Sequence, residues 1–246
     1  MKSAKKEIKS SKYKMIFFDM DGTLVDVSHY EEKSNKIGVG MWHVIFDNLG
    51  ILDKHRQLKR KFEAGEFTSS IEWTNEACKI LKINNLTEEK FSKIINDQPF
   101  IRGAGETILE LKKLGYKTAI ITGSFSALAK RLQKEFGVDE VIAHCDFKFN
   151  RDGKLKNWKL LPCCGHEDKV GVFLQMVKRH RVIPSECVYV GDDVNDISVF
   201  QKVGLSIAFN CNKKEVKDVV DIVVEGKDLR LILKRISDSA KKLSSH

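Results

Sequence analysis

The sequence predicts an α/β protein: a doubly wound parallel sheet with a small helical cap domain. From Gly103 onward, short apolar runs alternate with helical patterns, and this order is typical of a parallel sheet covered by helices. An earlier apolar run, Met15-Ile16-Phe17-Phe18, has the length of one short buried strand. Between these regions, residues 26–99 carry apolar residues at three- and four-residue steps without strand alternation, so they predict an inserted set of helices.

The later elements follow from local signals. Gly115 and Gly137 are expected to end two helices, because glycine is the usual residue just after a helix. Thr87 is placed to cap the last helix of the insert, and Asn150–Gly153 is a hairpin signal. The other strands are expected at residues 116–121, 140–143, 187–190, 205–208 and 222–224, and the helices of the core at 104–114, 126–136, 170–180 and 196–203.

These patterns divide the chain into three parts. Residues 14–25 and 100–246 are expected to form the α/β core, and residues 26–99 the helical cap. The first fourteen residues hold six lysines and one acidic residue. They lack the apolar stretch of a signal peptide, so residues 1–13 are expected to be a basic flexible tail.

Composition narrows the class of protein. The chain has 246 residues, 42% of them hydrophobic, which is enough for a full core. Its formal net charge of +9 favours anionic partners, such as phosphorylated metabolites, nucleic acid or an acidic surface. No apolar stretch is long enough to cross a membrane.

The cysteines indicate a reducing, cytoplasmic location. None of the six forms a Cys-x2-Cys pair or a regular disulfide framework. Cys163 and Cys164, with His166 nearby, suggest zinc at first sight, but adjacent cysteines lack the usual ligand spacing.

The first strand runs directly into two carboxylates. Asp19 and Asp21 lie two residues apart, so they project to the same side of an extended chain, and Gly22 permits a turn after them. Such neighbours repel each other unless one is protonated or a divalent cation lies between them. An isolated pair of this kind is usually an acidic surface turn; the apolar strand before it and Gly-Thr-Leu after it favour a functional site.

Two further strand ends carry polar residues. Thr122 follows the strand expected at 116–121, and Asp192 and Asp193 follow the strand at 187–190. Ligands of doubly wound sheets bind at the carboxyl ends of the strands, near the point where the strand order reverses. The sequence therefore predicts that these residues share one site with Asp19 and Asp21.

Four motifs in this order resemble the haloacid dehalogenase superfamily, from about Lys14 to the end of the chain. They are DMDGT at 19–23, ITGS at 121–124, Lys169 at the start of a helix, and GDDVND at 191–196. Within the superfamily, the chain resembles the phosphoserine phosphatases through FEAGEF, TGSF, GDDVNDISVF, LSIAF and DLRLILK. The resemblance implies a Rossmann-like core and a phosphatase dependent on Mg2+, acting through an aspartyl-phosphate.

The resemblance also implies roles for individual residues. Asp19 is the expected nucleophile and Asp21 the expected general acid. Thr122 is expected to bind the phosphate through its hydroxyl, and Lys169 to supply positive charge. The implied Mg2+ ligands are the Asp19 carboxylate, the Asp21 backbone carbonyl and Asp192, and the residues expected around the phosphate and the metal are Gly123, Asp193, Asn195 and Asp196.

The cap departs from the phosphoserine phosphatases. In that family, a glutamate and an arginine clamp the amino and carboxylate groups of serine, and the corresponding positions by spacing hold Ser28 and Thr74. Unless Glu31 or Arg56 replaces them, recognition of phosphoserine should be weak. The specificity candidates in the cap are Ser28, Trp42, Trp73 and Thr74, together with Tyr30 and His43.

Two alternatives remain at this stage. A phosphomutase would share the same core motifs, and a non-enzymatic module could use the basic surface to bind anions or nucleic acid. The second alternative predicts no need for Asp19 and an affinity that falls steeply with salt. The expected partner is a small phosphorylated metabolite, with nucleic acid disfavoured, no membrane and no prediction of the oligomeric state.

Overall fold

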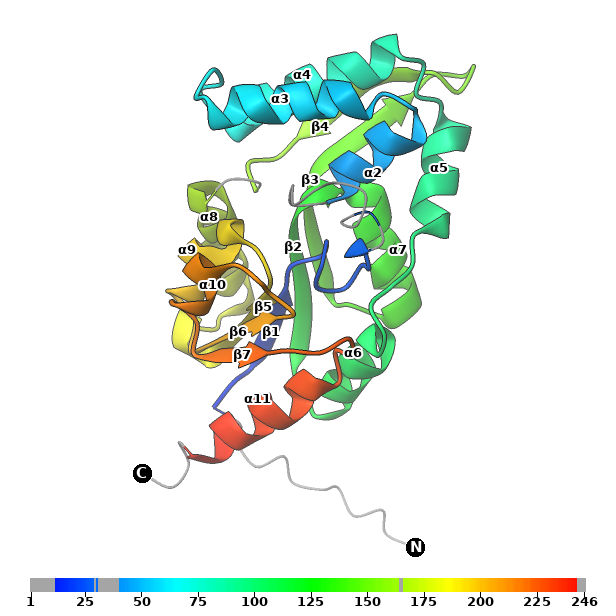
Figure 1. The fold of residues 1–246 in the computed structure, drawn as a ribbon. Helices are drawn as coiled ribbons and strands as arrows, with labels where there is room; N and C mark the ends of the chain where they lie inside the picture. Colours follow the sequence, from blue (N-terminus) through cyan, green and yellow to red (C-terminus); the bar gives the residue numbers. More distant parts are fainter. Residues whose placement is uncertain (1–11, 29, 31–39, 164–165, 243–246) are drawn as a thin grey trace, which may run out of the picture.

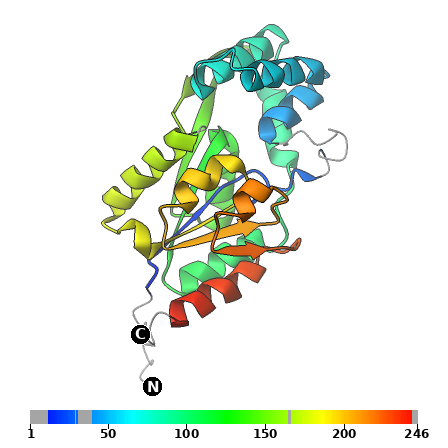
Figure 2. The same cartoon turned by 60° about the vertical axis from the view of Figure 1, so that its left-hand side comes forward.

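The structure is a computed structural model that describes residues 12–28, 30, 40–163 and 166–242. Most of the predicted basic tail, the clamp candidate Glu31 and Cys164 lie outside these ranges. The predicted α/β fold class is confirmed, with one sheet covered by helices on both faces (Figures 1 and 2).

The sheet has seven strands in the order β4-β3-β2-β1-β5-β6-β7. All neighbours are parallel except the β3–β4 hairpin. The strands are β1 (Met15–Phe18), β2 (Lys117–Phe125), β3 (Glu140–Phe149), β4 (Leu155–Leu160), β5 (Cys187–Gly191), β6 (Leu205–Phe209) and β7 (Ile222–Val224).

Strand β1 lies at the centre of the sheet. All four of its residues are buried, and Phe18 pairs with Ile120 of β2 on one side and Val190 of β5 on the other. After β1, the chain adds β2, β3 and β4 on one side of it and then β5, β6 and β7 on the other, so the strand order reverses at β1. The residues after Phe18 therefore emerge at the point where open α/β sheets bind ligands.

Alternate residues of β1 bury two separate apolar layers. Ile16 and Phe18 pack on the face covered by α6 (Ala104–Lys113), α7 (Ser126–Phe136) and α11 (Leu231–Lys242). Met15 and Phe17 pack on the other face, below α8 (His166–His180), α9 (Ile197–Phe200) and α10 (Lys214–Lys217). The continuous apolar run read from the sequence thus reflects burial on both faces.

The insert forms four helices among its described residues. They are α2 (Met41–Asn48), α3 (Leu52–Glu63), α4 (Ser70–Ile83) and α5 (Glu88–Asp97). Thr87 caps α5 as predicted, accepting a hydrogen bond from the Lys90 backbone N–H. Helices α3 and α4 lie across the top of Figure 1, beyond the end of the sheet. The domain boundaries remain a prediction.

The predicted strand at 140–143 is too short. Strand β3 continues to Phe149 and forms the predicted hairpin with β4, which extends beyond the rest of the sheet to the cap. There the Trp158 indole N–H donates to Asn75 Oδ1 at 2.8 Å, and Lys82 Nζ donates to the Lys156 carbonyl at 2.7 Å. The sequence does not predict this longer strand because the stretch contains charged residues. On an extended hairpin these residues remain exposed on one side.

The two connections between the insert and the core run side by side. The Asp26 N–H donates to the Pro99 carbonyl at 2.9 Å, and Gln98 Nε2 donates to the Asp26 carbonyl at 2.6 Å. Arg131 of α7 donates to the carbonyls of Ile95 and Gln98, both at 2.8 Å. These bonds fix the end of α5 to the core. No helix in the described part of the chain is both long and apolar enough to span a membrane.

We expect Arg131→Met to lower the free energy of unfolding by about 1.5–3 kcal/mol, because two half-buried carbonyls lose a charged donor. Lys130→Met is the matched control. That lysine is largely exposed and lies 3.8 Å from Asp146, so its loss should cost at most about 1 kcal/mol. Urea denaturation measures both values, and equal effects of the two substitutions would contradict the assignment.

Candidate active site

Asp19 and Asp21 leave β1 at the base of the cap. The Asp19 backbone N–H donates to the Val190 carbonyl at 2.9 Å, which continues the β1–β5 pairing by one residue. The chain then turns at Gly22, which has φ +86° and lies so close to Asp192 that an added Cβ would meet its Oδ2 at 2.3 Å. A glycine is required there by both conformation and space. The turn brings the DMDGT and GDD segments into contact.

The cap contacts Asp21 directly. The backbone N–H of Met41, the first residue of α2, donates to Asp21 Oδ2 at 2.7 Å. The second oxygen, Oδ1, is buried and accepts no well-formed hydrogen bond among the described residues, although the Ser124 hydroxyl is near enough to lower the pKa of Asp21 slightly against the effect of burial. Burial raises the pKa of Asp21 to about 6. The carboxyl group can therefore be either protonated or ionised near neutral pH.

Lys169 lies fully buried beneath Asp19. Its Nζ donates to Asp19 Oδ1 at 2.7 Å and to Asp196 Oδ1 at 2.5 Å. Burial opposes the charge of Lys169, but the two carboxylates outweigh burial and raise the pKa of the ammonium well above its usual value. Lys169 is thus a permanent cation that holds the nucleophile candidate in place.

Asp196 orients this cation from behind. Its Oδ1 also accepts the Tyr189 hydroxyl at 2.7 Å, and its Oδ2 accepts the backbone N–H groups of Asp192 and Asp193, each at 3.2 Å. Both oxygens are therefore occupied by donors from the protein. Tyr189 was not predicted from the sequence, because a tyrosine within an apolar strand reads as core.

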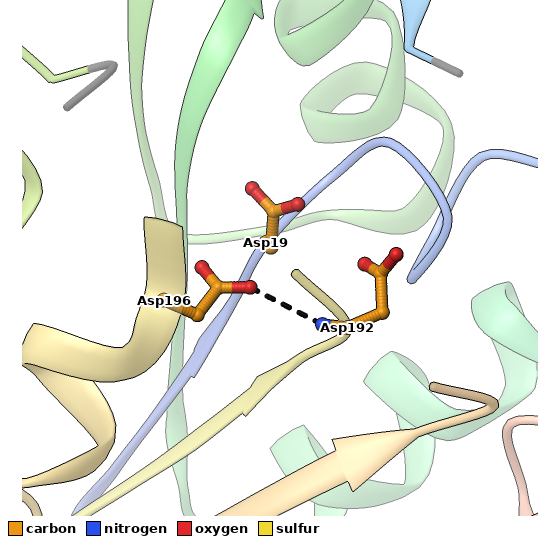
Figure 3. A group of neighbouring side chains, drawn as sticks. All are labelled: Asp19, Asp192 and Asp196. Carbon is orange, nitrogen blue, oxygen red and sulfur yellow. Dashed lines mark hydrogen bonds between the residues drawn. The ribbon is translucent and has the colours of Figure 1, made fainter. Parts of the chain in front are cut away.

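Three carboxylates meet at the ends of β1 and β5 (Figure 3). One oxygen from each of Asp19, Asp192 and Asp196 lies within 4.8 Å of the others. Burial raises the pKa of Asp19 to about 7 despite Lys169, and burial with repulsion from Asp19 raises the pKa of Asp192 well above its usual range. The carboxylates of Asp19 and Asp192 point to the same side in Figure 3, whereas one oxygen of Asp196 faces the Asp192 backbone nitrogen. The other oxygen of Asp196 accepts from Lys169.

This arrangement fits a divalent cation. Three acidic side chains lie together, and the one lysine ammonium among them pairs only with Asp19 and Asp196, so a second cation would relieve the repulsion that raises the pKa of Asp19 and Asp192. The donor atoms are all oxygens, which Mg2+ prefers. Since donors from the protein occupy both oxygens of Asp196, the oxygens that remain for a metal belong to Asp19 and Asp192.

A cavity of about 360 Å3 opens above these carboxylates, between the core and the cap. Its floor includes Thr122, whose Oγ1 accepts the Ser124 backbone N–H at 3.1 Å. Lys169 and Asp196 lie below the floor rather than on it. The cavity brings together most of the predicted residues: Asp19, Asp21, Trp42, Trp73, Thr122, Gly123, Asp192, Asp193 and Asn195.

The structure does not bring Ser28 or Thr74 to this cavity. Ser28 is exposed and its hydroxyl donates to Asp26 Oδ1 at 2.6 Å. Thr74 is buried in α4 and is not among the residues that line the cavity; its hydroxyl donates to the Ser70 carbonyl at 2.8 Å and contacts His144 Nε2 at 2.9 Å. Arg56, considered as a replacement for the clamp, lies 3.1 Å from Asp53 instead.

The cavity includes cap residues that the sequence analysis missed. His55, Lys59 and Phe62 line it from α3, and Ser70 lines it from α4. The signal for the first three was present in the sequence, since their spacing of four and then three residues puts them on one face of a helix. His43, named among the candidates, also lines the cavity.

Comparison with known proteins identifies the class. The family model described as haloacid dehalogenase-like hydrolase matches residues 13–204, and the chain belongs to this family. Within it, the chain is similar to the phosphoserine phosphatase of Methanocaldococcus jannaschii, at 32% identity over 92% of this chain and 98% of that protein. The phosphoserine phosphatase of Albidiferax ferrireducens is 24% identical over 92% of this chain and 90% of that protein.

Solved structures also show the similarity to phosphoserine phosphatases. A phosphoserine phosphatase with an analogue of its phospho-aspartyl intermediate and a substrate-bound complex of a phosphoserine phosphatase each match with a TM-score of 0.73 and 29% identity. Each match covers 91% of this chain and 98% of the other. The predictions of a phosphoserine phosphatase-like member of this family, and of a phosphoric monoester hydrolase, are confirmed.

The elevated pKa of Asp19 predicts how stability changes with pH. Its folded-state pKa of about 7 lies above the unfolded value of 3.8, so the folded chain binds more protons and loses stability as pH rises through 7. In chelator, the free energy of unfolding should fall by about 2–3 kcal/mol between pH 5 and 8, with most of the loss below pH 7. Asp19→Asn and excess Mg2+ should each flatten this slope in urea denaturation, and a flat wild-type profile in chelator would contradict the assignment.

Proposed function

We propose that the protein is a Mg2+-dependent phosphatase that hydrolyses a small phosphomonoester through an aspartyl-phosphate on Asp19. The observation that carries this proposal is the pairing of Asp19 with buried Lys169 at the floor of a cavity that Asp21 also lines. A carboxylate held by a fixed cation and open to a cavity can act as a nucleophile. Its neighbour Asp21, with a pKa near neutrality, can exchange protons with the reacting oxygen.

In the first step, an Asp19 oxygen attacks phosphorus as the bond from phosphorus to the leaving oxygen breaks. Asp21 gives its proton to the leaving alkoxide, so a neutral alcohol departs and Asp21 becomes ionised. The Met41 N–H fixes Asp21 Oδ2, which leaves the unpartnered Oδ1 as the oxygen for this transfer. Lys169 balances the negative charge that accumulates around Asp19.

In the second step, water attacks phosphorus and the bond to Asp19 breaks. Asp21 takes a proton from the water, which restores its acid form, while inorganic phosphate and the Asp19 carboxylate are released. The same group thus acts first as acid and then as base. Asp196 and Tyr189 support both steps by holding Lys169 in position from below.

Mg2+ would be held by the Asp19 carboxylate, the Asp21 backbone carbonyl and Asp192, and it would offset the charge of the phosphoryl group. Thr122, Gly123 and Asn195 line the cavity on the side where the phosphate would lie. The Asn195 side-chain oxygen is buried and has no partner among the residues that the structure describes, as expected for a group that meets a ligand. Asp193 is paired with Lys213 Nζ at 2.5 Å and would act at the edge of the site.

The relatives are phosphoserine phosphatases, but the cap argues against tight recognition of serine. By spacing, the clamp positions are Ser28 and Thr74, and both lie outside the cavity lining. We therefore propose a different small phosphorylated metabolite as substrate. The cytoplasmic location stays a prediction.

Removal of the metal should abolish turnover, because the charges of phosphate and nucleophile would then repel each other. We expect chelator-treated protein to lose at least 100-fold in kcat on para-nitrophenyl phosphate and to recover it with Mg2+. Inorganic phosphate should appear in equal amount to the free alcohol, as hydrolysis requires and phosphoryl transfer does not. Full activity in chelator would exclude the proposed dependence on a metal.

The acid role of Asp21 predicts a dependence on the leaving group. Asp21→Asn should reduce kcat/KM about 100-fold or more for alkyl phosphates, whose alkoxides need a proton, and much less for para-nitrophenyl phosphate. Asp19→Asn is the comparison, since loss of the nucleophile should abolish turnover of both. Equal losses for both substrates in Asp21→Asn would exclude Asp21 as the acid.

A further inference from the structure

The cap end of the cavity is built from aromatic rings. We call it the cap pocket and define it by Trp42, His43, His55, Phe62 and Trp73, which all line the cavity. The Trp42 and Trp73 rings lie 5.6 Å apart at 78° to each other, and the His55 ring lies 6.1 Å from Trp73. The two indoles touch edge to face, so they form a corner and leave no slot between parallel rings for a flat base.

Several polar atoms in this pocket have no partner. Both ring nitrogens of His43, Nδ1 of His55 and Nε1 of Trp73 are buried and make no hydrogen bond within the described part of the chain. His43 and His55 are only 1% and 4% exposed. Buried polar atoms are normally satisfied, so four such atoms on three residues that line one pocket favour a ligand that supplies hydrogen bonds.

The two histidines are uncharged. Burial lowers the pKa of His43, and burial with the neighbouring His43 lowers the pKa of His55 to about 4. A neutral imidazole has one N–H donor and one nitrogen acceptor, and the Trp73 indole adds a donor. A hydroxyl group both donates and accepts, so it matches either side of each imidazole.

The cap pocket has no clamp for an amino acid. Every carboxylate that lines the cavity belongs to the core: Asp19, Asp21, Asp192 and Asp193. Lys59 is the one charged cap residue among the described lining residues; burial lowers its pKa, and the nearby carboxylates of Glu63 and Asp193 partly balance its charge. An ammonium group placed among the aromatic rings would have no acidic partner there, and its burial would be costly.

We propose that the cap pocket binds a neutral leaving group rich in hydroxyls, so that the substrate is a sugar or polyol monophosphate. Apolar C–H faces of the sugar or polyol would lie against the indole rings, while its hydroxyls meet His43, His55 and Trp73 Nε1. This inference rests on the proposed phosphatase function for the position of the phosphate, at the carboxylate end of the cavity.

Binding to a non-reacting variant tests the ligand class without turnover. Asp19→Asn, titrated calorimetrically in excess Mg2+, should bind ribose 5-phosphate or sorbitol 6-phosphate at least tenfold more tightly than O-phosphoserine or AMP. Tighter binding of O-phosphoserine or AMP overturns the inference, as does equal binding of all four. Failure of the wild type to hydrolyse any phosphomonoester would instead count against the proposed function, so the two failures are distinguishable.

Trp73→Phe tests the predicted contacts, because it keeps an aromatic ring and removes only the indole N–H and some area. We expect about tenfold weaker affinity for the tighter-binding sugar or polyol phosphate in the Asp19→Asn background, with a smaller change for its analogue lacking one hydroxyl. Trp158→Phe is the matched control, since that N–H donates to Asn75 away from the cavity. Equal effects of the two substitutions, or no effect of Trp73→Phe, would overturn the assignment.

Discussion

The site depends on two buried ion pairs that share Lys169, one with the carboxylate of Asp19 and one with that of Asp196. An uncompensated charge in the interior is costly, so the lysine is stable there only while both acids surround it. In turn, Asp19 stays oriented because Lys169 reaches it from α8. Three segments distant in the sequence are thereby held in one geometry: the end of β1, the start of α8 and the turn after β5.

The parallel sheet makes this geometry possible. Strand β1 pairs with β2 and β5, so Asp19 and Asp192, which follow β1 and β5, lie at the same sheet edge as Thr122, which is near the carboxyl end of β2. Because these residues lie within a strand or close after its end, strand register determines where their side chains lie. The cap covers the space above this edge, and burial of Asp19 and Asp21 there raises their pKa.

The contrast between the sheet edge and the helical cap explains which parts of the site could be predicted from the sequence. Asp19, Asp21 and Asp192 follow apolar runs that can only be buried strands, so their position at one sheet edge follows from topology. The specificity candidates of the cap depend on the exact position along a helix, because each successive residue turns the side chain by about 100°. Trp73 therefore lines the cavity, while the next residue, Thr74, is not part of the lining and contacts His144 instead.

The bond from the Met41 N–H to Asp21 also constrains the residue before it. Gly40 takes an ordinary extended conformation, yet an added Cβ would meet Asp21 Oδ2 at 2.9 Å. Any larger residue would push the first turn of α2 away from the carboxyl group that the turn holds. Position 40 lies outside every recognisable motif, but the proton transfer proposed for Asp21 restricts it to glycine. The sequence signature of this enzyme thus extends into the cap.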